Sequence, residues 1–259
     1  ADHPYGHGKA EFLSAAVEGA LILVAATSIV TEAVRQIVAG PEIGRFGTGI
    51  LLAGAAGGAN MLLALYLLRV SRSEESAALE ADAHHILADV VTSAASIAAL
   101  GAVWLTGFAY LDPLIALVVA ANIVRVGWGV VRKALAGLLD EADFDFLHNV
   151  AETLQEARHD DWIDVHELRT WRSGAFRHID LHVVLPRFYT IEQGHVAADT
   201  IEERLLELVP AGGDVVVHID PCSAEWCSGC VLRDCAVRES PFVERAPFRL
   251  GRVTSKGEV

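Results

Sequence analysis

The chain has 259 residues, of which 53% are hydrophobic, and its formal net charge at pH 7 is −14. Residues 11–135 are rich in apolar residues, Gly and Ala, whereas most acidic residues lie in the second half. A nucleic-acid-binding protein would need a basic surface, so this charge argues against a nucleic-acid partner. The composition indicates packed membrane helices followed by an acidic soluble domain.

The sequence opens with a polar loop at residues 1–11, in which three residues separate His3 from His7. Two imidazoles this close together could bind a metal, although histidines in a loop are more often simply solvated. The first residue is Ala1 rather than Met, and no signal peptide precedes the first apolar run. We therefore expect that the sequence begins partway through a longer protein.

Four apolar stretches are long enough to cross a bilayer, which takes roughly 20 residues in a helix. We predict these spans at about residues 11–38, 47–68, 80–105 and 113–133. The Lys and Arg residues of the short loops fall mainly on one side of four alternating spans. The positive-inside rule then places the amino-terminal loop, the loop at residues 69–79 and the whole second half in the cytoplasm.

His85 and Asp89 form an ionisable pair inside the third predicted span. Because they are four residues apart, a helix places them on one face, one turn apart. An Asp at the centre of a span costs at least about 2.5 kcal/mol, so such residues usually have a function. The pair could be half of a tetrahedral site for a divalent metal such as zinc. Alternatively, it bonds internally or to neighbouring helices, and the pair alone does not decide between these interpretations.

The second half has the pattern of a small α+β unit at residues 140–221. We expect, in order, a helix, two strands joined by a tight turn, a second helix and a third strand. The elements are predicted at residues 144–158, 164–171, 176–185, 191–208 and 214–219. Beyond this unit, residues 222–259 are expected to form a Cys-rich segment and, past Ser240, a loosely ordered tail.

Strand alternation sorts the polar residues of this unit onto one face of the sheet. In the second strand it separates His178, Asp180 and His182 from the apolar residues between them. In the third strand it places His218 and Asp220 on one face. We interpret His178 and Asp180 as solvated surface residues, because polar groups on a sheet face often are.

All four cysteines are found within fourteen residues, as Cys222, Cys227, Cys230 and Cys235. Thiolates this closely spaced suit a tetrahedral zinc site, structural or regulatory. Disulfides are the competing interpretation, but a cytoplasmic location disfavours them.

Several ordered motifs together resemble the cation diffusion facilitator transporters, which are six-span proteins with a cytoplasmic ferredoxin-like domain. The motifs are HPYGHGKAE at 3–11, ADAHHILAD at 81–89, TG at 106–107, DP at 112–113, LRT at 168–170 and HIDP at 218–221. The resemblance extends from residue 1 to about residue 222. It implies a helical membrane bundle at residues 1–139, with four of six spans present, and a dimerising metal-binding domain at residues 140–221.

The resemblance also implies a role for individual residues. His85 and Asp89 correspond to half of the family's transport site, whose other ligands come from a span that we expect to precede this sequence. His3 and His7 correspond to two ligands of a loop site that varies among members. A further set corresponds to a binuclear metal site across the dimer in some members: His166, His182, His195, His218 and Asp220.

The sequence thus predicts a divalent metal efflux transporter of the inner or plasma membrane. The expected ion is zinc, with ferrous iron, cadmium or cobalt as alternatives, and it is exchanged for protons. The expected partners are a second copy of the chain, the bilayer, metal ions and protons. A membrane-anchored metal sensor or store is the main alternative. A metal-dependent hydrolase ranks last, because no nucleophile accompanies the ligands, so we do not expect an enzyme.

Overall fold

The computed structural model describes residues 3, 6–40, 48–74, 76–210 and 212–256. The chain divides into two compact units, Ala1–Leu139 and Asp140–Val259. The first unit contains only helices in its described part, and the second combines a sheet with helices. This combination confirms the fold class expected from the sequence.

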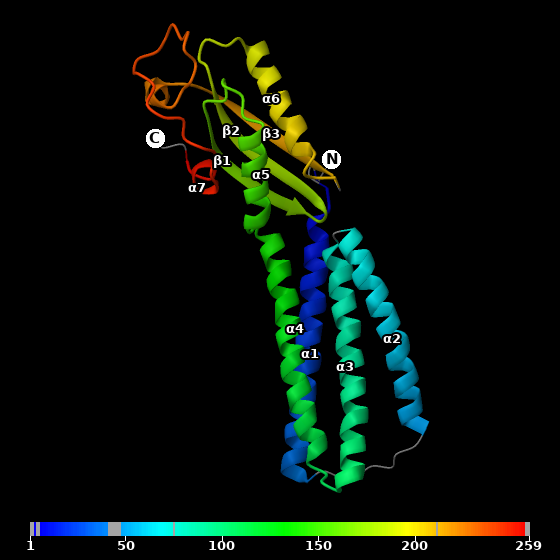
Figure 1. The fold of residues 1–259 in the computed structure, drawn as a ribbon. Helices are drawn as coiled ribbons and strands as arrows, with labels where there is room; N and C mark the ends of the chain where they lie inside the picture. Colours follow the sequence, from blue (N-terminus) through cyan, green and yellow to red (C-terminus); the bar gives the residue numbers. More distant parts are fainter. Residues whose placement is uncertain (1–2, 4–5, 41–47, 75, 211, 257–259) are drawn as a thin grey trace. The chain divides into compact units, whose positions relative to one another are not determined.

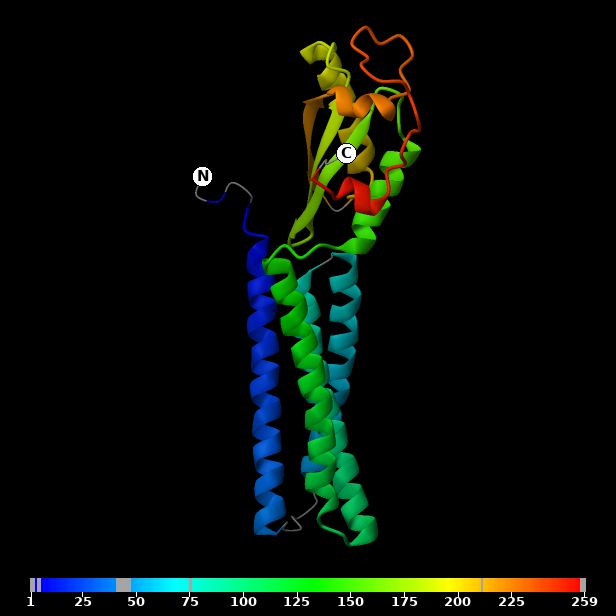
Figure 2. The ribbon, with the colours of Figure 1, turned by 90° about the vertical axis from the view of Figure 1, so that its left-hand side faces the viewer.

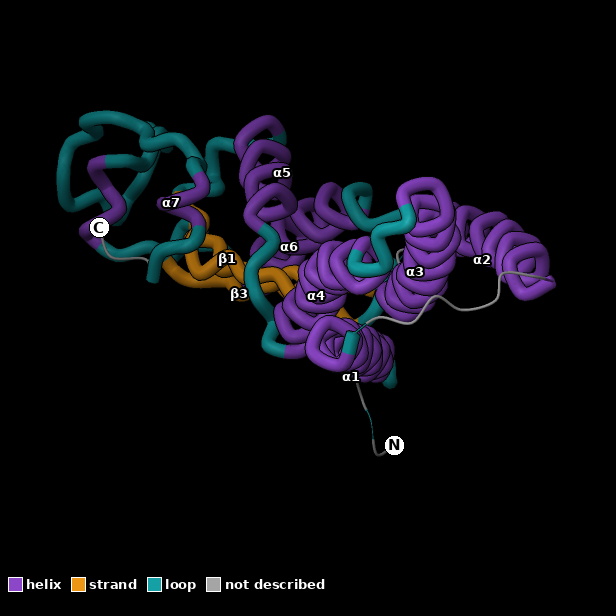
Figure 3. The backbone as a smooth tube through the Cα atoms, turned by 90° about the horizontal axis from the view of Figure 1, so that it is seen from below, coloured by secondary structure: helices purple, strands orange, loops and turns teal. Residues whose placement is uncertain are grey.

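Four long helices make the first unit (Figure 1): α1 (Lys9–Ala39), α2 (Thr48–Ser73), α3 (Ala77–Thr106) and α4 (Leu111–Leu138). Helix α1 packs mainly along α4, α2 packs along α3, and α3 contacts both α4 and α1. The view along the helices shows α3 between α2 and α4 (Figure 3). Helix α3 begins at the cap Ser76, whose Oγ accepts a hydrogen bond from the Leu79 amide, and it ends at Gly107 in the left-handed conformation.

Within the described residues, three helices are long and apolar enough to cross a membrane: Lys9–Ala39, Ala78–Val103 and Leu111–Leu138. Large apolar side chains such as Leu13 and Val118 are exposed along these helices, as expected where a helix faces lipid. Helix α2 lies where the second span was expected, and its crossing of the membrane stays a prediction.

Small residues allow α1 and α4 to approach closely. A Cβ atom at Gly19 would lie 2.7 Å from Val131 Cγ2, and one at Gly127 would lie 2.9 Å from Ile22 Cγ2. Close backbone approach at Gly and Ala is the usual basis of helix association in membranes, where the hydrophobic effect does not separate helix from lipid.

The second unit contains a three-stranded sheet in the order β1-β2-β3. Its elements are α5 (Phe144–Glu156), β1 (Asp164–Ser173), β2 (Phe176–Leu185), α6 (Ile191–Leu206) and β3 (Gly213–Pro221). Strands β1 and β2 are antiparallel, and β2 and β3 are parallel. One hydrophobic core joins apolar residues of α5, α6 and one face of the sheet. The turned ribbon shows α5 beside the sheet (Figure 2). The opposite face is thereby left open for polar side chains.

The expectation of a loosely ordered tail past Ser240 is wrong. Phe248 and Val253 are 3% and 0% exposed in the core of the second unit, and residues Leu250–Val253 form the short helix α7. The Arg158 guanidinium donates a hydrogen bond to Ala246 O at 2.6 Å and lies over the Phe248 ring at 3.7 Å. Because two isolated apolar residues give no periodicity, this packing has no signal in the local sequence.

Gly127→Ala should loosen the contact between α1 and α4, because the new methyl group must displace Ile22. Overpacking of this kind costs about 1–3 kcal/mol in unfolding free energy. The measurement is the midpoint of thermal unfolding of the detergent-solubilised protein. The control is Gly129→Ala on the same helix, where a Cβ would meet no atom within 4 Å. Equal midpoints for the two variants would contradict the close contact.

Phe248→Ala should destabilise the second unit by about 3–5 kcal/mol, the usual cost of truncating a buried aromatic side chain. Phe242→Ala provides the control, because this second tail Phe is 48% exposed and should change stability by less than about 0.5 kcal/mol. Hydrogen exchange of the β1 and β2 amides reports the difference. Unchanged exchange in Phe248→Ala would mean that the tail does not contribute to the core.

Candidate metal centres

The open face of the sheet carries a row of three histidines. The strand register places His166 opposite His182, and His182 opposite His218. The intervening residues of β2 point to the core, where Ile179 is 0% exposed. The predicted alternation of β2 therefore holds, and it brings three imidazoles from distant parts of the sequence to one line across the sheet.

The Asp220 carboxylate lies among these three imidazoles. Its Oδ2 atom is 2.9 Å from His182 Nδ1 and 3.4 Å from His166 Nε2, and its Oδ1 atom is 3.1 Å from His218 Nδ1. The rings of His182 and His218 have centroids 4.3 Å apart. One carboxylate thus contacts every histidine of the row.

His166, His182 and Asp220 have the geometry of a metal site. Among the residues that the structure describes, these are the only three whose ligand atoms all lie within 4.8 Å of one another. Two imidazole nitrogens and a carboxylate oxygen are donors that zinc accepts. Nδ1 of His166 is buried without a hydrogen-bond partner in the described part of the chain. The donor set therefore fits a divalent metal.

A β-bulge positions His166 on the open face. The register of β1 against β2 shifts between His166 and Arg169, and Glu167 has a positive φ of 50°. The extra residue keeps His166 on the open face while Leu168 points into the core, where it is 3% exposed. The Glu167 amide, which would lose its ladder partner, donates to Ser255 O at 2.8 Å. The carboxy-terminal tail thus supports the bulge beside the metal site.

Asp164 is a buried acid at the edge of this site. It is 2% exposed, its Oδ2 atom is 3.7 Å from His166 Nδ1, and its Oδ1 accepts a hydrogen bond from Arg252 Nε at 2.6 Å. Burial raises the pKa of Asp164, and Arg252 opposes that rise. Burial also lowers the pKa of the nearby Arg158 to about 10. Asp164 thus links Arg252 of the carboxy-terminal tail to His166 of the candidate site.

Two further histidines that the sequence analysis considered do not belong to this row. His195, expected at the metal site, is on α6, where its Nδ1 is 3.5 Å from Asp199 Oδ1, and it does not belong to the three-residue group. His178, interpreted as solvated, is in fact 3% exposed. Its Nδ1 lies 2.6 Å from Asp214 Oδ1 and its ring stacks on Trp171. Trp171 on the neighbouring strand β1 and Phe176 on β2 itself contact this imidazole, which alternation alone could not show.

In the membrane unit, α3 places His85 and Asp89 on one face. His85 Nε2 is 3.9 Å from Asp89 Oδ2, and the two side chains are 40% and 58% exposed. In the amino-terminal loop, the exposed rings of His3 and His7 have centroids 4.4 Å apart. Asp2, the acidic residue next to His3 in the sequence, lies outside the described residues.

Two long-range contacts beside these sites could not be predicted from the sequence. Lys133 Nζ on α4 is 2.7 Å from Glu80 Oε1 on α3, and His84 Nε2 lies 3.8 Å from the same oxygen. Only the four-residue spacing of Glu80 and His84 is a local signal. Trp226 stacks on His166 with ring centroids 6.0 Å apart and an angle of 14° between the planes. Nothing in the sequence links these two residues.

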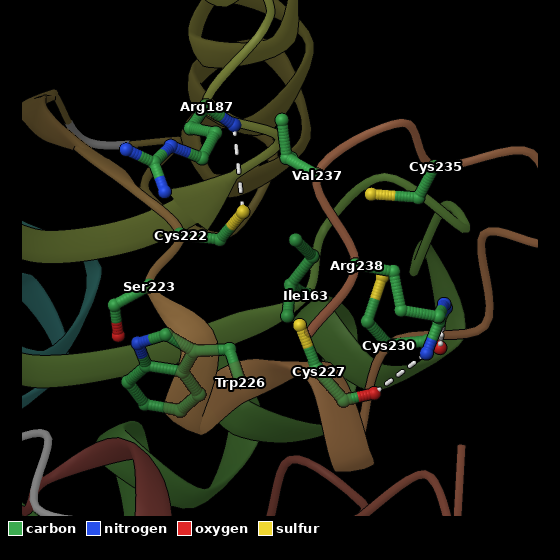
Figure 4. A pocket seen from close by; sticks show the side chains of 10 residues that line it. All are labelled: Ile163, Arg187, Cys222, Ser223, Trp226, Cys227, Cys230, Cys235, Val237 and Arg238. Carbon is green, nitrogen blue, oxygen red and sulfur yellow. Dashed lines mark hydrogen bonds between the residues drawn. The ribbon is translucent and has the colours of Figure 1, made fainter. Parts of the chain in front are cut away.

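The four cysteines line one pocket (Figure 4). All are free thiols, with Cys227 and Cys230 buried and Cys222 and Cys235 partly exposed. Burial raises the pKa of the Cys222 thiol, and the other three thiols act in the same direction. No three of the sulfur atoms lie within 4.8 Å of one another.

Comparison with known proteins agrees with this arrangement. Residues 1–139 match the cation efflux transmembrane domain, and residues 142–222 match the cytoplasmic domain of cation efflux proteins. An uncharacterized transporter of Synechocystis sp., sll1263, is 33% identical over 220 residues, which cover 85% of this chain and 71% of that protein.

The cation-efflux pump FieF of Serratia proteamaculans is 31% identical over 226 residues, covering 86% of this chain and 73% of the pump. FieF of Escherichia coli O127:H6 is 31% identical over 230 residues, with the same two coverages. These matches span both units and confirm the resemblance seen in the motifs. The chain belongs to the cation efflux, or cation diffusion facilitator, family, whose members are multi-pass membrane transporters with a cytoplasmic α+β domain.

Proposed function

We propose that the chain moves divalent metal cations, principally zinc, out of the cytoplasm in exchange for protons. The observation that carries this proposal is the pair His85 and Asp89, one turn apart on an apolar helix and both accessible. An ionisable pair of this kind is costly against lipid, so it requires a polar partner at that depth. A metal ion and further ligands would satisfy both side chains.

Proton exchange follows from the chemistry of these two ligands. A metal needs the unprotonated imidazole of His85 and the ionised carboxylate of Asp89, so binding releases any proton held there. When the bundle exposes the pair to a more acidic side, protons compete for the same atoms and the metal leaves. The cycle needs no covalent intermediate, and transport is driven by the proton gradient.

The ligand chemistry narrows the choice of ion. Imidazole suits zinc, and also ferrous iron, cobalt and cadmium, whereas all-oxygen sites suit manganese and magnesium. His85 therefore favours these four ions over manganese and magnesium, and we take zinc as the expected ion, with the other three as alternatives. His3 and His7 would capture the ion in the cytoplasmic loop before it enters the bundle.

The cytoplasmic site would sense the metal in a homodimer. His166, His182 and Asp220 supply three ligands, and His218 contacts the same carboxylate at 3.1 Å. A bound divalent ion would offset the negative charge of this acidic domain and draw its ligands together. His195 would join this site only from elsewhere in the dimer, because in its own chain it pairs with Asp199. Zinc at the four cysteines is a separate proposal, because those thiols line a different pocket.

Asp89→Ala should abolish zinc uptake by proteoliposomes that contain the full-length protein under an imposed pH gradient, because it removes one ligand and one proton-exchanging group. Asp82→Ala is the control: it removes an exposed carboxylate two turns before Asp89 on the same helix and should leave uptake unchanged. Uptake is followed with a zinc-sensitive dye trapped inside.

Zinc uptake that survives in Asp89→Ala would refute the transport site. If wild-type protein moves ferrous iron and not zinc, the site stands and the choice of ion is wrong. A sensor or store without transport predicts no gradient-dependent uptake of either ion by the wild type.

Asp220→Asn should weaken zinc binding in the cytoplasmic domain by more than about tenfold, because the neutral amide is a poor ligand and the carboxylate contacts three imidazoles. Zinc should raise the unfolding temperature of the wild type and raise it less in this variant. Asp199→Asn, which alters an exposed acid on α6, is the matched control. Calorimetric titration of full-length protein with zinc gives the affinities, and equal affinities in both variants would contradict the site.

A further inference from the structure

The four thiols belong to one short segment wrapped around a common pocket. Cys222 follows β3 directly, Cys227 lies in the 3-10 helix η1 (Ala224–Ser228), and Cys230 and Cys235 lie in the loop beyond it. Figure 4 shows their side chains arranged around the same space, over Ile163. The pocket shares no ligand residue with the group of His166, His182 and Asp220.

One arginine holds the backbone of this segment in place. Arg238 Nη1 donates to Cys227 O at 2.9 Å and to Ser240 O at 3.3 Å. Its Nη2 donates to Cys230 O at 2.9 Å and to Leu232 O at 2.6 Å. A single guanidinium thus fixes both buried cysteines before any ion arrives, which lowers the entropic cost of closing a site.

Burial disfavours a thiolate at Cys222, but other groups of the pocket offset part of that cost. Arg187 and Arg238 both line it, and none of its ten lining residues carries a carboxylate. Two backbone amides point at sulfur: Arg187 N is 3.4 Å from Cys222 Sγ, and Glu239 N is 3.5 Å from Cys227 Sγ. Hydrogen bonds and positive charge around metal ligands stabilise their ionised form. Two disulfides would be neutral and would place no anion beside these arginines.

A metal would have to draw the sulfurs together. With Zn–S bonds of about 2.3 Å, tetrahedral geometry puts the sulfur atoms about 3.8 Å apart. No three of them are within 4.8 Å in the structure, so the loop must tighten on binding. Cys235 lies in the loop outside η1 and is partly exposed, and it is the ligand best able to move.

The segment also contacts the histidine site. Trp226 lies between Cys222 and Cys227 in sequence, and its indole stacks on His166. A small hydrophobic cluster joins Trp226, Cys222 and Leu232 to the buried residues Ile163, Val184 and Cys230. Tightening the cysteine segment would therefore fix the indole, and with it the orientation of the His166 ring.

We propose that Cys222, Cys227, Cys230 and Cys235 bind one soft divalent metal of the zinc class as a tetrathiolate site. The bound metal holds Trp226 against His166 and so positions this imidazole for the neighbouring site. The second part rests on the proposed metal binding by His166, His182 and Asp220, and the first part does not.

Cobalt(II) titration of the reduced full-length protein tests the tetrathiolate site. Four thiolates should give a near-ultraviolet charge-transfer band and strong visible bands that saturate at one ion per chain. The bands should disappear in the double variant Cys227→Ser/Cys230→Ser. They should persist in Ser223→Ala, which alters a pocket residue without a thiol, and in Asp220→Asn, which removes the histidine site. Absence of the bands in wild type, or their survival in the double variant, overturns the proposal.

The link through Trp226 has its own readout. The zinc affinity of the histidine site, measured by competition with a chromophoric chelator, should fall about 10- to 100-fold in the double cysteine variant. Trp226→Ala should produce the same loss while keeping the cobalt bands, and Ser223→Ala should produce none. Full affinity in the double variant would overturn the link. If zinc uptake fails but the cobalt bands appear, the transport proposal is wrong and the cysteine site stands.

Discussion

The register of the cytoplasmic sheet is the constraint on which the histidine row and its candidate metal site depend. His166, His182 and His218 are cross-strand neighbours, so they form a row only in this pairing. A slip of one residue would turn the imidazole of β2 into the core and expose Ile179 or Leu181. The apolar residues that α5 and α6 cover therefore determine the position of the polar ones. In this domain, the strand pairing that packs the core also brings the three imidazoles together.

Helix association in the membrane unit has a different basis, because lipid tails are as apolar as the side chains and the hydrophobic effect does not drive helices together. Its helices meet through small residues, and Gly19, Gly127 and Gly137 permit the close approach of α1 and α4. Against this apolar background, His85 and Asp89 are costly, and they contribute nothing to the contact of α1 with α4. Their place on α3 is explained by ion binding more readily than by stability.

Sequence periodicity could predict the elements and the faces, and it could not predict long-range contacts. The alternation in β2 separated His182 from the core, and the spacing of His85 and Asp89 placed both on one helix face. The burial of His178 by Trp171 depends on a neighbouring strand, and the packing of Phe248 depends on α5. The bulge at Glu167 could not be predicted either, because the Glu167 amide donates its hydrogen bond to Ser255 O, far along the chain.

Two contacts that the sequence could not predict meet at His166. The match to the family's cytoplasmic domain ends at residue 222, yet residues beyond it support this imidazole from two directions. The tail completes the bulge beside it through Ser255, and the cysteine segment stacks Trp226 on its ring. A ligand whose orientation is fixed loses less entropy when it binds a metal, so both supports should strengthen the site. In this chain, residues after the family domain thus contact the surroundings of a candidate ligand within that domain.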